Sequence, residues 1–289
     1  MDFFGCYTAI VTPFRDHEVD YAALHKLVDE QIEAGVTGLV PVGTTGESPT
    51  LNFEDHIKVI ERVNSWVNKR CQVIAGTGAN STEEAIHLSK LAAEIGVDAT
   101  LQVSPYYNKP SAEGLYRHFN KVAEASGLPM VLYNVPGRTG REIPLDIVLR
   151  LSKIPLVQAI KEASGNVDRV SAILNACDIT VLSGDDNLTL PMMALGAKGV
   201  ISVASNVIPA EISAMAALAL QGDFAAALRI HRNFYPLFRD LFIESNPIPV
   251  KAALAQMGKI KEEYRLPLCE LDEGKRQKLM ATLKEVGVI

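Results

Sequence analysis

The sequence alternates short apolar runs with helix-like stretches, and this repeat most constrains the fold. The runs begin at Cys6, Val36, Cys71, Asp98, Pro129, Pro155, Asp178 and Ala197. Each unit spans roughly 25–35 residues, the size of one strand–helix step. Strands that alternate with helices form parallel sheets, and continuously apolar strands are covered on both faces. We therefore expect an α/β protein with a (β/α)₈ TIM barrel. An open doubly wound sheet is the alternative, since strand order cannot be read from the repeat.

The residues after the eighth run read as helix only, which predicts a C-terminal helical extension. We place the barrel in residues 1–224 and the helical region in residues 225–289. No stretch between them is long enough to act as a flexible linker, so independent motion is not expected. Helix boundaries are also visible: Gly35 is placed to end one helix, and Ser81 with Glu84 to begin another.

Composition excludes several classes of function. Lys and Arg total 28 against 34 Asp and Glu, and no basic run forms a patch for nucleic acid or anionic lipid. The four cysteines are dispersed and none forms a CxxC pair, so neither a zinc site nor a disulfide framework is expected. No apolar run approaches the ~20 residues of a membrane span, and the N-terminus is a poor signal peptide. These features favour a cytoplasmic metabolic enzyme without a metal or cofactor.

The second strand ends in the sequence GTTGES, residues 43–48. Active sites of such barrels lie at the C-terminal ends of the strands. Here Thr44 and Thr45 stand between glycines, whose backbone N–H groups can approach a ligand closely. Hydroxyls and N–H groups together suit a carboxylate. A tight turn leading into the next helix, begun by Ser48 or Thr50, explains the motif equally well.

The fifth strand ends in YNVPGRTG, residues 133–140. A phenol such as that of Tyr133 can both give and take a proton. Arg138 lies in the following loop between glycines, and its guanidinium could donate two hydrogen bonds to a substrate carboxylate. The alternatives are a half-buried rim tyrosine and a surface salt bridge.

Lys161, near the end of the sixth strand, is the most specific single signal. If Ala159 points into the barrel, Lys161 points there too, while Ile160 and Glu162 face the helices. Burial disfavours an ammonium and lowers its pKa, which leaves an amine able to attack a carbonyl. The alternative is a rim lysine that reaches water or pairs with Glu162.

Tyr133 and Lys161 lie one strand–helix unit apart, so they belong to neighbouring strands about 4.8 Å apart. An amine nucleophile beside a proton shuttle, facing a cradle for a carboxylate, suits Schiff-base chemistry on a 2-oxo acid. Asp185 and Asp186 follow the seventh strand, but no histidine stands at a matching spacing. We therefore assign them to a turn or polar rim rather than to a metal site.

Six motifs together resemble the 4-hydroxy-tetrahydrodipicolinate synthase family, also called dihydrodipicolinate synthases, of the Schiff-base pyruvate aldolase superfamily. They are GTTGES, SPYYNKPS, YNVPGRTG, AIKEAS, SGDD and NPIPVK, and they extend over nearly the whole chain. The resemblance implies a (β/α)₈ barrel that condenses pyruvate with L-aspartate 4-semialdehyde, in the first committed step of lysine and diaminopimelate biosynthesis. It also implies a homotetramer built as a dimer of dimers.

The resemblance assigns roles to the motif residues. It implies that Lys161 forms the imine with pyruvate, and that Thr44, Tyr133 and Tyr107 relay protons, Tyr107 in a neighbouring subunit's site. The substrate-binding positions it implies are Thr45 for the pyruvate carboxylate, Arg138 for the semialdehyde carboxylate, and the Val203 carbonyl close to the imine.

The resemblance further implies feedback inhibition by L-lysine at a dimer interface. The matching positions are Ser48, Pro49, His56, Asn80, Glu84 and Tyr106. Phe53 stands where lysine-sensitive members commonly have a histidine, and Pro49 replaces a small residue. We therefore expect L-lysine to inhibit the enzyme, and these two positions leave the strength of inhibition open.

Two other functions remain open. A sibling aldolase, such as N-acetylneuraminate lyase or a 2-keto-3-deoxy sugar-acid aldolase, would keep the lysine and tyrosine, but usually lacks an arginine at the position of Arg138. A non-catalytic barrel that binds a 2-oxo acid is disfavoured by the intact Thr44, Thr45, Tyr133 and Lys161.

Overall fold

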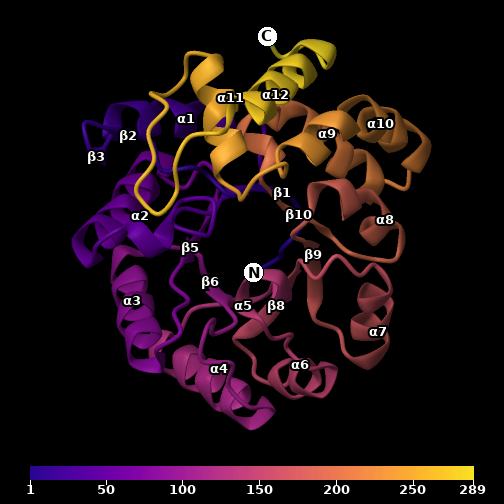
Figure 1. The fold of residues 1–289 in the computed structure, drawn as a ribbon. Coiled ribbons are helices and arrows are strands. Elements are labelled where there is room, and N and C mark those ends of the chain that lie inside the picture. The colour runs from indigo at the N-terminus through magenta and orange to yellow at the C-terminus, as the bar shows by residue number, and fades with distance from the viewer.

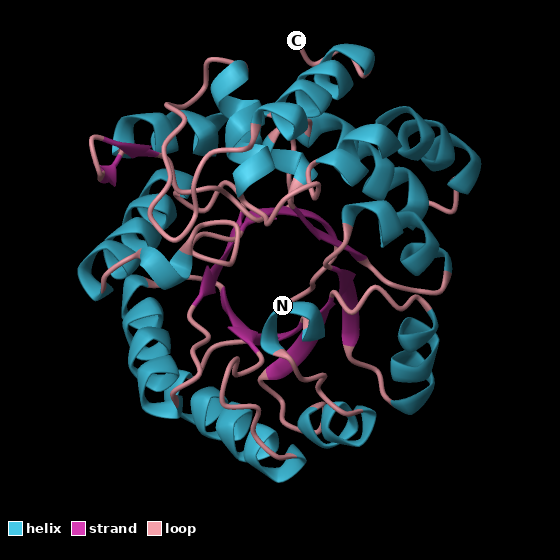
Figure 2. Ribbon diagram, viewed as in Figure 1, coloured by secondary structure: helices cyan, strands magenta, loops and turns pink.

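The computed structural model describes residues 1–289 and contains a closed eight-stranded parallel barrel (Figures 1 and 2). The barrel order is β1-β10-β9-β8-β7-β6-β5-β4, with β1 paired to β4 to close the ring. The strands are β1 (Gly5–Thr8), β4 (Gly38–Leu39), β5 (Gln72–Gly76), β6 (Ala99–Val103), β7 (Met130–Asn134), β8 (Val157–Glu162), β9 (Thr180–Ser183) and β10 (Gly199–Ser202). All eight predicted strands are present, so the barrel is confirmed over the open sheet.

Helices surround the barrel as an outer ring (Figure 2). They are α1 (Tyr21–Glu33), α2 (Phe53–Val67), α3 (Thr82–Ile95), α4 (Ala112–Ser126), α6 (Leu145–Leu151), α7 (Asp168–Ala176), α8 (Thr189–Ala194) and α9 (Pro209–Leu220). The single turn α5 (Pro136–Thr139) lies inside this ring, over the barrel opening in the view of Figure 1. The expected helix boundaries are confirmed at two places. The Ser81 side chain caps α3 by accepting from the Glu84 N–H, and Gly35, with φ +79°, follows the end of α1. None of the helices is long and apolar enough to cross a membrane.

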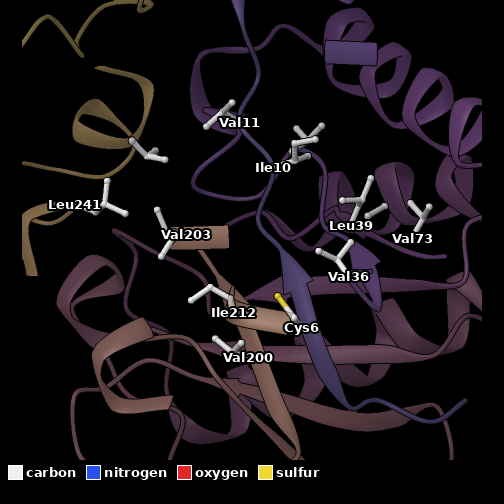
Figure 3. Packing of buried hydrophobic residues seen from close by; sticks show 14 of the residues in the cluster. Cys6, Ile10, Val11, Val36, Leu39, Val73, Val200, Val203, Ile212 and Leu241 are labelled. Atoms are coloured by element: carbon white, nitrogen blue, oxygen red, sulfur yellow. The ribbon is translucent and has the colours of Figure 1, made fainter. Parts of the chain in front are cut away.

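The barrel strands divide their buried side chains between two cores. Inside the barrel lie mainly aliphatic residues of alternate strand positions, such as Ala159 and Leu182, together with aromatic rings such as that of Tyr7. The other alternate positions pack against the helices in a larger cluster. Figure 3 shows this outer packing, with Cys6 of β1 and Val200 of β10 beside Ile212 of α9. This period-two alternation fixes which residues face the barrel interior.

Three further helices follow the barrel: α10 (Phe224–Asp240), α11 (Ile248–Gln256) and α12 (Glu273–Glu285). They form the predicted C-terminal extension and gather at one side of the ring (Figure 1). Their buried side chains, such as Leu237 and Leu279, belong to the same hydrophobic cluster as the barrel helices. The division at residues 224 and 225 remains our proposal for the boundary between the two parts.

Two short elements were not expected from the sequence. Strands β2 (Phe14–Arg15) and β3 (Glu18–Val19) form a small antiparallel hairpin after β1, with Asp16 and His17 at positive φ in its turn. The YNVPGRTG segment, expected to be a loop, contains the single turn of helix α5, because Pro136 supplies the fixed φ that suits a first helical position.

Candidate active site

Lys161 and Tyr133 are directly paired across β8 and β7, as the sequence predicted. Both point into the barrel: Tyr133 belongs to the inner cluster, as does Ala159, and Lys161 is only 5% exposed. The Lys161 Nζ lies 4.3 Å from the centroid of the Tyr133 ring. The amine is therefore held against the negative face of an aromatic ring and largely removed from water.

The neighbours of Lys161 leave its amine without a carboxylate partner. No carboxylate lies within 4.0 Å of Nζ. Glu162, the alternative partner considered from the sequence, faces the helices and binds Arg169 at 2.9 Å and the Asn134 amide at 3.0 Å. The lysine is consequently free to react, because the adjacent acid is satisfied on the other side of the strand.

The two aspartates after β9 behave differently from each other. Burial raises the pKa of Asp185 to about 6, although the Lys161 ammonium opposes this rise. Asp186 begins a short 3₁₀ turn, in line with the turn that we expected, but it is buried: it is 2% exposed and accepts hydrogen bonds from the Ser202 hydroxyl and the backbone N–H groups of Val203 and Ala204. Its carboxylate thus fixes the end of β10. No cluster of three His, Cys, Asp or Glu side chains is suited to a metal.

Thr44 and Tyr133 line the same small hollow at the mouth of the barrel, together with Gly43 and Ser48. The GTTGES turn does not start the next helix as the alternative interpretation supposed, since Asn52 is the residue that caps α2. Instead, Ser48–Thr50 form a short 3₁₀ turn. Ser48 and Thr50 therefore belong to this turn and do not cap α2, while Thr44 lines the hollow at the strand end.

Asn246 connects Thr45 with Arg138, and sequence reasoning did not single it out. Its Nδ2 donates to the Thr45 Oγ1 at 2.9 Å, and its backbone carbonyl accepts from the Arg138 guanidinium at 3.0 Å. Thr45 is 2% exposed, whereas Arg138 is exposed. The motif NPIPVK was visible in the sequence, but nothing local indicates that it contacts residues 201 and 108 positions earlier.

A cavity of about 210 Å³ joins candidate catalytic positions with part of the predicted lysine site. Its walls include Thr44 and Arg138 from the first group and Ser48, Pro49 and Tyr106 from the second. Burial raises the pKa of the Tyr106 phenol, with Glu84 contributing and a hydrogen bond to the Asn80 backbone opposing. Asn80 and Glu84 thus both influence the Tyr106 phenol, while their part in a lysine site stays a prediction.

His56 lies apart from that cavity. It is 7% exposed, its Nε2 is 2.8 Å from the carbonyl of Gly76, and burial lowers its pKa. His56, on α2, therefore contacts the last residue of β5. Phe53 is 44% exposed and stacks on His87 with ring centroids 4.8 Å apart.

The last two predicted residues, Tyr107 and Val203, have opposite surroundings: Tyr107 is exposed and Val203 is buried. Tyr107 is 91% exposed and holds a left-handed conformation with φ +70°. The Val203 carbonyl accepts from both the backbone N–H and the side-chain Nδ2 of Asn206, at 3.1 and 3.0 Å. It is therefore already engaged at the end of β10.

These observations define a class of protein: a (β/α)₈ barrel that presents a buried lysine and a paired tyrosine beside threonine hydroxyls at its C-terminal mouth. The comparisons with known proteins narrow this class. Residues 2–286 match the model of the dihydrodipicolinate synthetase family. The chain belongs to this family, and it is therefore an enzyme of the lyase type that the sequence motifs indicated.

Three relatives illustrate the match. A 4-hydroxy-tetrahydrodipicolinate synthase of Methanocaldococcus jannaschii is 52% identical, over 99% of this chain and 100% of its own length. A chloride-inhibited dihydrodipicolinate synthase from Acinetobacter baumannii, solved with pyruvate, is 48% identical, with a TM-score of 0.97 and 99% of each chain covered. An enzyme of this name from Cyanidioschyzon merolae, solved with lysine bound, is 42% identical, with a TM-score of 0.96 and 99% of each chain covered.

Proposed function

We propose that this enzyme condenses pyruvate with L-aspartate 4-semialdehyde to give 4-hydroxy-tetrahydrodipicolinate, the first committed step toward diaminopimelate and lysine. The observation that carries the proposal is the buried Lys161, which lies on the Tyr133 ring and has no carboxylate partner. The names of relatives about 50% identical over the whole chain agree with this activity.

The chemistry begins at the Lys161 amine. Its lone pair attacks the ketone carbon of pyruvate, and loss of water from the resulting carbinolamine gives a protonated imine. The imine withdraws electrons, so the adjacent methyl loses a proton and an enamine forms. The enamine carbon then bonds to the aldehyde carbon of the second substrate, whose oxygen takes up a proton. Transimination by the substrate's own amino group closes the ring and releases the Lys161 amine.

Tyr133 and Thr44 are assigned to move the protons of these steps, since they line one hollow next to Lys161. A relay of this kind contributes about 10²–10⁴-fold to rate in enzymes generally. We place Tyr107 in the relay of a neighbouring subunit: its 91% exposure and left-handed backbone carry the side chain out from its own barrel. Contact with a second copy would bury this aromatic surface.

The two substrate carboxylates are assigned to different groups. Thr45 and nearby N–H groups of the GTTGES turn would hold the pyruvate carboxylate, and the exposed Arg138 would hold that of the semialdehyde. We also assign Val203 to the substrate-binding residues and propose that its carbonyl lies near the imine. Arg138 favours the synthase over a sibling aldolase, because N-acetylneuraminate lyases and sugar-acid aldolases usually lack an arginine there.

Assembly and regulation follow from the same residues. We infer a homotetramer, formed as a dimer of dimers, in which Tyr107 of one subunit enters the site of its partner. We also infer inhibition by L-lysine near Tyr106, supported by the lysine-bound relative and by the cavity that Ser48, Pro49 and Tyr106 share with Thr44. The reaction as proposed needs no metal or cofactor, and we assign the enzyme to the cytoplasm.

Two variants at Arg138 test whether this residue binds the semialdehyde carboxylate and not that of pyruvate. Arg138→Ala is expected to leave borohydride trapping of pyruvate at Lys161 intact while raising the KM for the semialdehyde at least tenfold. Arg138→Lys should recover part of the affinity. Equal losses of trapping and of semialdehyde use would contradict the assignment. Turnover of sialic acid or of a keto-deoxy sugar acid in place of the semialdehyde would instead support a sibling aldolase.

A further inference from the structure

The GTTGES turn is strained at both of its ends. Val42 and Glu47 have φ values of +55° and +57°, in the left-handed region that non-glycine side chains rarely adopt. For a β-branched residue such as Val42 this backbone is a true outlier. Strain of this kind persists at functional sites only where the surroundings hold it in place. Thr44 and Thr45 lie between the two strained residues, so their positions depend on that support.

Glu47 receives its support from the C-terminal helices. Its Oε1 lies 2.5 Å from the Nζ of Lys251 on α11, and neither side chain has any exposed surface. Its Oε2 accepts from the backbone N–H of Arg265 at 3.4 Å. The Lys251 ammonium also lies 4.2 Å from the centroid of the Phe14 ring. Segments more than two hundred residues apart are thus joined directly at the turn.

Stability alone is a weak reason for such an ion pair. Removing two charges from water costs as much as their attraction returns, and buried pairs can often be replaced by apolar side chains without loss. A role in fixing one geometry is a better-supported use. Two hydrogen bonds agree with it: the Asn246 Nδ2 donates to Thr45 Oγ1 at 2.9 Å, and the Thr12 hydroxyl donates to the Gly46 carbonyl at 2.7 Å.

We propose that the Glu47–Lys251 ion pair is a positioning device, by which α11 fixes the GTTGES turn so that Thr44 and Thr45 face the pyruvate carboxylate. The inference rests on the function proposed above. Neither side chain has exposed surface with which to reach a substrate, so both act through the turn. By this proposal the C-terminal extension contributes to catalysis, because α11 follows the barrel in sequence and its Lys251 binds Glu47 of the GTTGES turn.

The decisive variant is the double substitution Glu47→Gln with Lys251→Met. It removes both charges at once, so no unpaired charge remains buried and the fold is expected to be retained. We expect the pyruvate concentration that half-saturates borohydride trapping to rise at least tenfold, and the KM for the semialdehyde to change less than threefold. A pyruvate half-saturation within twofold of the unmodified enzyme would show that the pair serves the fold only.

A matched control comes from α10. Asp240 is a fully buried carboxylate that accepts from Thr282 and pairs with Arg239 in the same helical region, away from the turn. Asp240→Asn should lower the melting temperature without moving the pyruvate half-saturation. A tenfold rise in this control would overturn the proposal, because general loosening of the helices would then explain the effect.

If the double variant does not fold, Thr12→Val takes its place. It is nearly isosteric and removes only the hydrogen bond to the Gly46 carbonyl, so an approximately threefold rise in pyruvate half-saturation would show that the turn geometry controls pyruvate binding. Lys251→Arg then tests the pair itself, because it keeps a counter-charge for Glu47 but changes the geometry of the contact; an unchanged pyruvate half-saturation in a folded Lys251→Arg enzyme would contradict the proposal. Borohydride trapping of the unmodified enzyme distinguishes a failure of this proposal from a failure of the proposed function. If it is not trapped at Lys161 at all, the Schiff-base assignment fails, whereas normal trapping that is insensitive to these variants refutes only the positioning role.

Discussion

Two lysines are buried in this molecule, and their surroundings differ in one respect. Lys161 and Lys251 are 5% and 0% exposed, and each ammonium lies over an aromatic ring, at 4.3 Å from Tyr133 and 4.2 Å from Phe14. Lys251 has a carboxylate at 2.5 Å, whereas no carboxylate lies within 4.0 Å of Lys161. Burial alone therefore does not mark a reactive lysine.

The permanent counter-ion accounts for the different roles. Burial lowers the pKa of Lys251, and Glu47 opposes this effect by favouring the charged form. A paired ammonium has no lone pair to offer a ketone, so Lys251 is suited to hold structure. Lys161 lies beside a phenol and threonine hydroxyls instead, which is the environment of a nucleophile.

Removing the amine of Lys161 should have the largest effect on activity. Lys161→Met keeps the length of the side chain, and we expect a loss of kcat of about 10³-fold or more because the imine cannot form. The melting temperature should stay the same or rise, since an unpaired polar group leaves the interior. Residual activity within tenfold of the unmodified enzyme would remove the distinction between the two lysines.

The same substitution at the second lysine should act on stability. Lys251→Met leaves the Glu47 carboxylate buried without its partner, which typically costs about 3–5 kcal/mol. Urea unfolding should detect this loss, while pyruvate is still trapped at Lys161, at higher concentration. A stability change below about 1 kcal/mol would indicate that the ion pair is not a buried structural contact.

The hydroxyl of Tyr133 distinguishes its ring from that of Phe14. Tyr133→Phe keeps the aromatic face under Lys161 and removes only the phenol. We expect kcat to fall by about 10²-fold, in the range of a lost proton-transfer group. Trapping at Lys161 should persist. An unchanged kcat would place the proton relay elsewhere.

The smallest expected effect is at Asp185, a carboxylate that interacts electrostatically with Lys161 without forming an ion pair with it. Its pKa is raised from 3.8 to about 6 by burial, so the folded state holds the proton more tightly than the unfolded state. Stability from this group is complete below pH 4 and is lost as pH rises through about 6. Asp185→Asn cannot ionise, so its stability relative to the unmodified enzyme should increase over that window by up to about 3 kcal/mol. A flat difference between pH 4 and 7 would contradict this.

The sequence predicted the parts of the site that depend on local periodicity. The alternation in β8 placed Lys161 inside the barrel and Glu162 outside, and the spacing of the strands placed Tyr133 beside Lys161. Both followed because a strand repeats every two residues and neighbouring βα units pair in parallel. The barrel was predicted correctly for the same reason. The family was predicted from the resemblance of the six motifs, not from periodicity, and it is confirmed as well.

The rest depends on contacts that leave no local pattern. Glu47 and Lys251 look like ordinary surface charges in the sequence, and Asn246 like the start of a turn. Their partners lie about two hundred residues away and are chosen by how α11 packs on the barrel mouth. The roles of Tyr107 and of the lysine-site residues stay predictions, because they depend on a second subunit or a bound ligand.

The most direct measurement of the central claim is the mass spectrum of the digested enzyme after treatment with pyruvate and borohydride. The account predicts one modified peptide, carrying reduced pyruvate on Lys161, and an unmodified peptide containing Lys251. Modification at Lys251, or at neither lysine, would contradict the claim that a missing counter-ion sets the nucleophile apart.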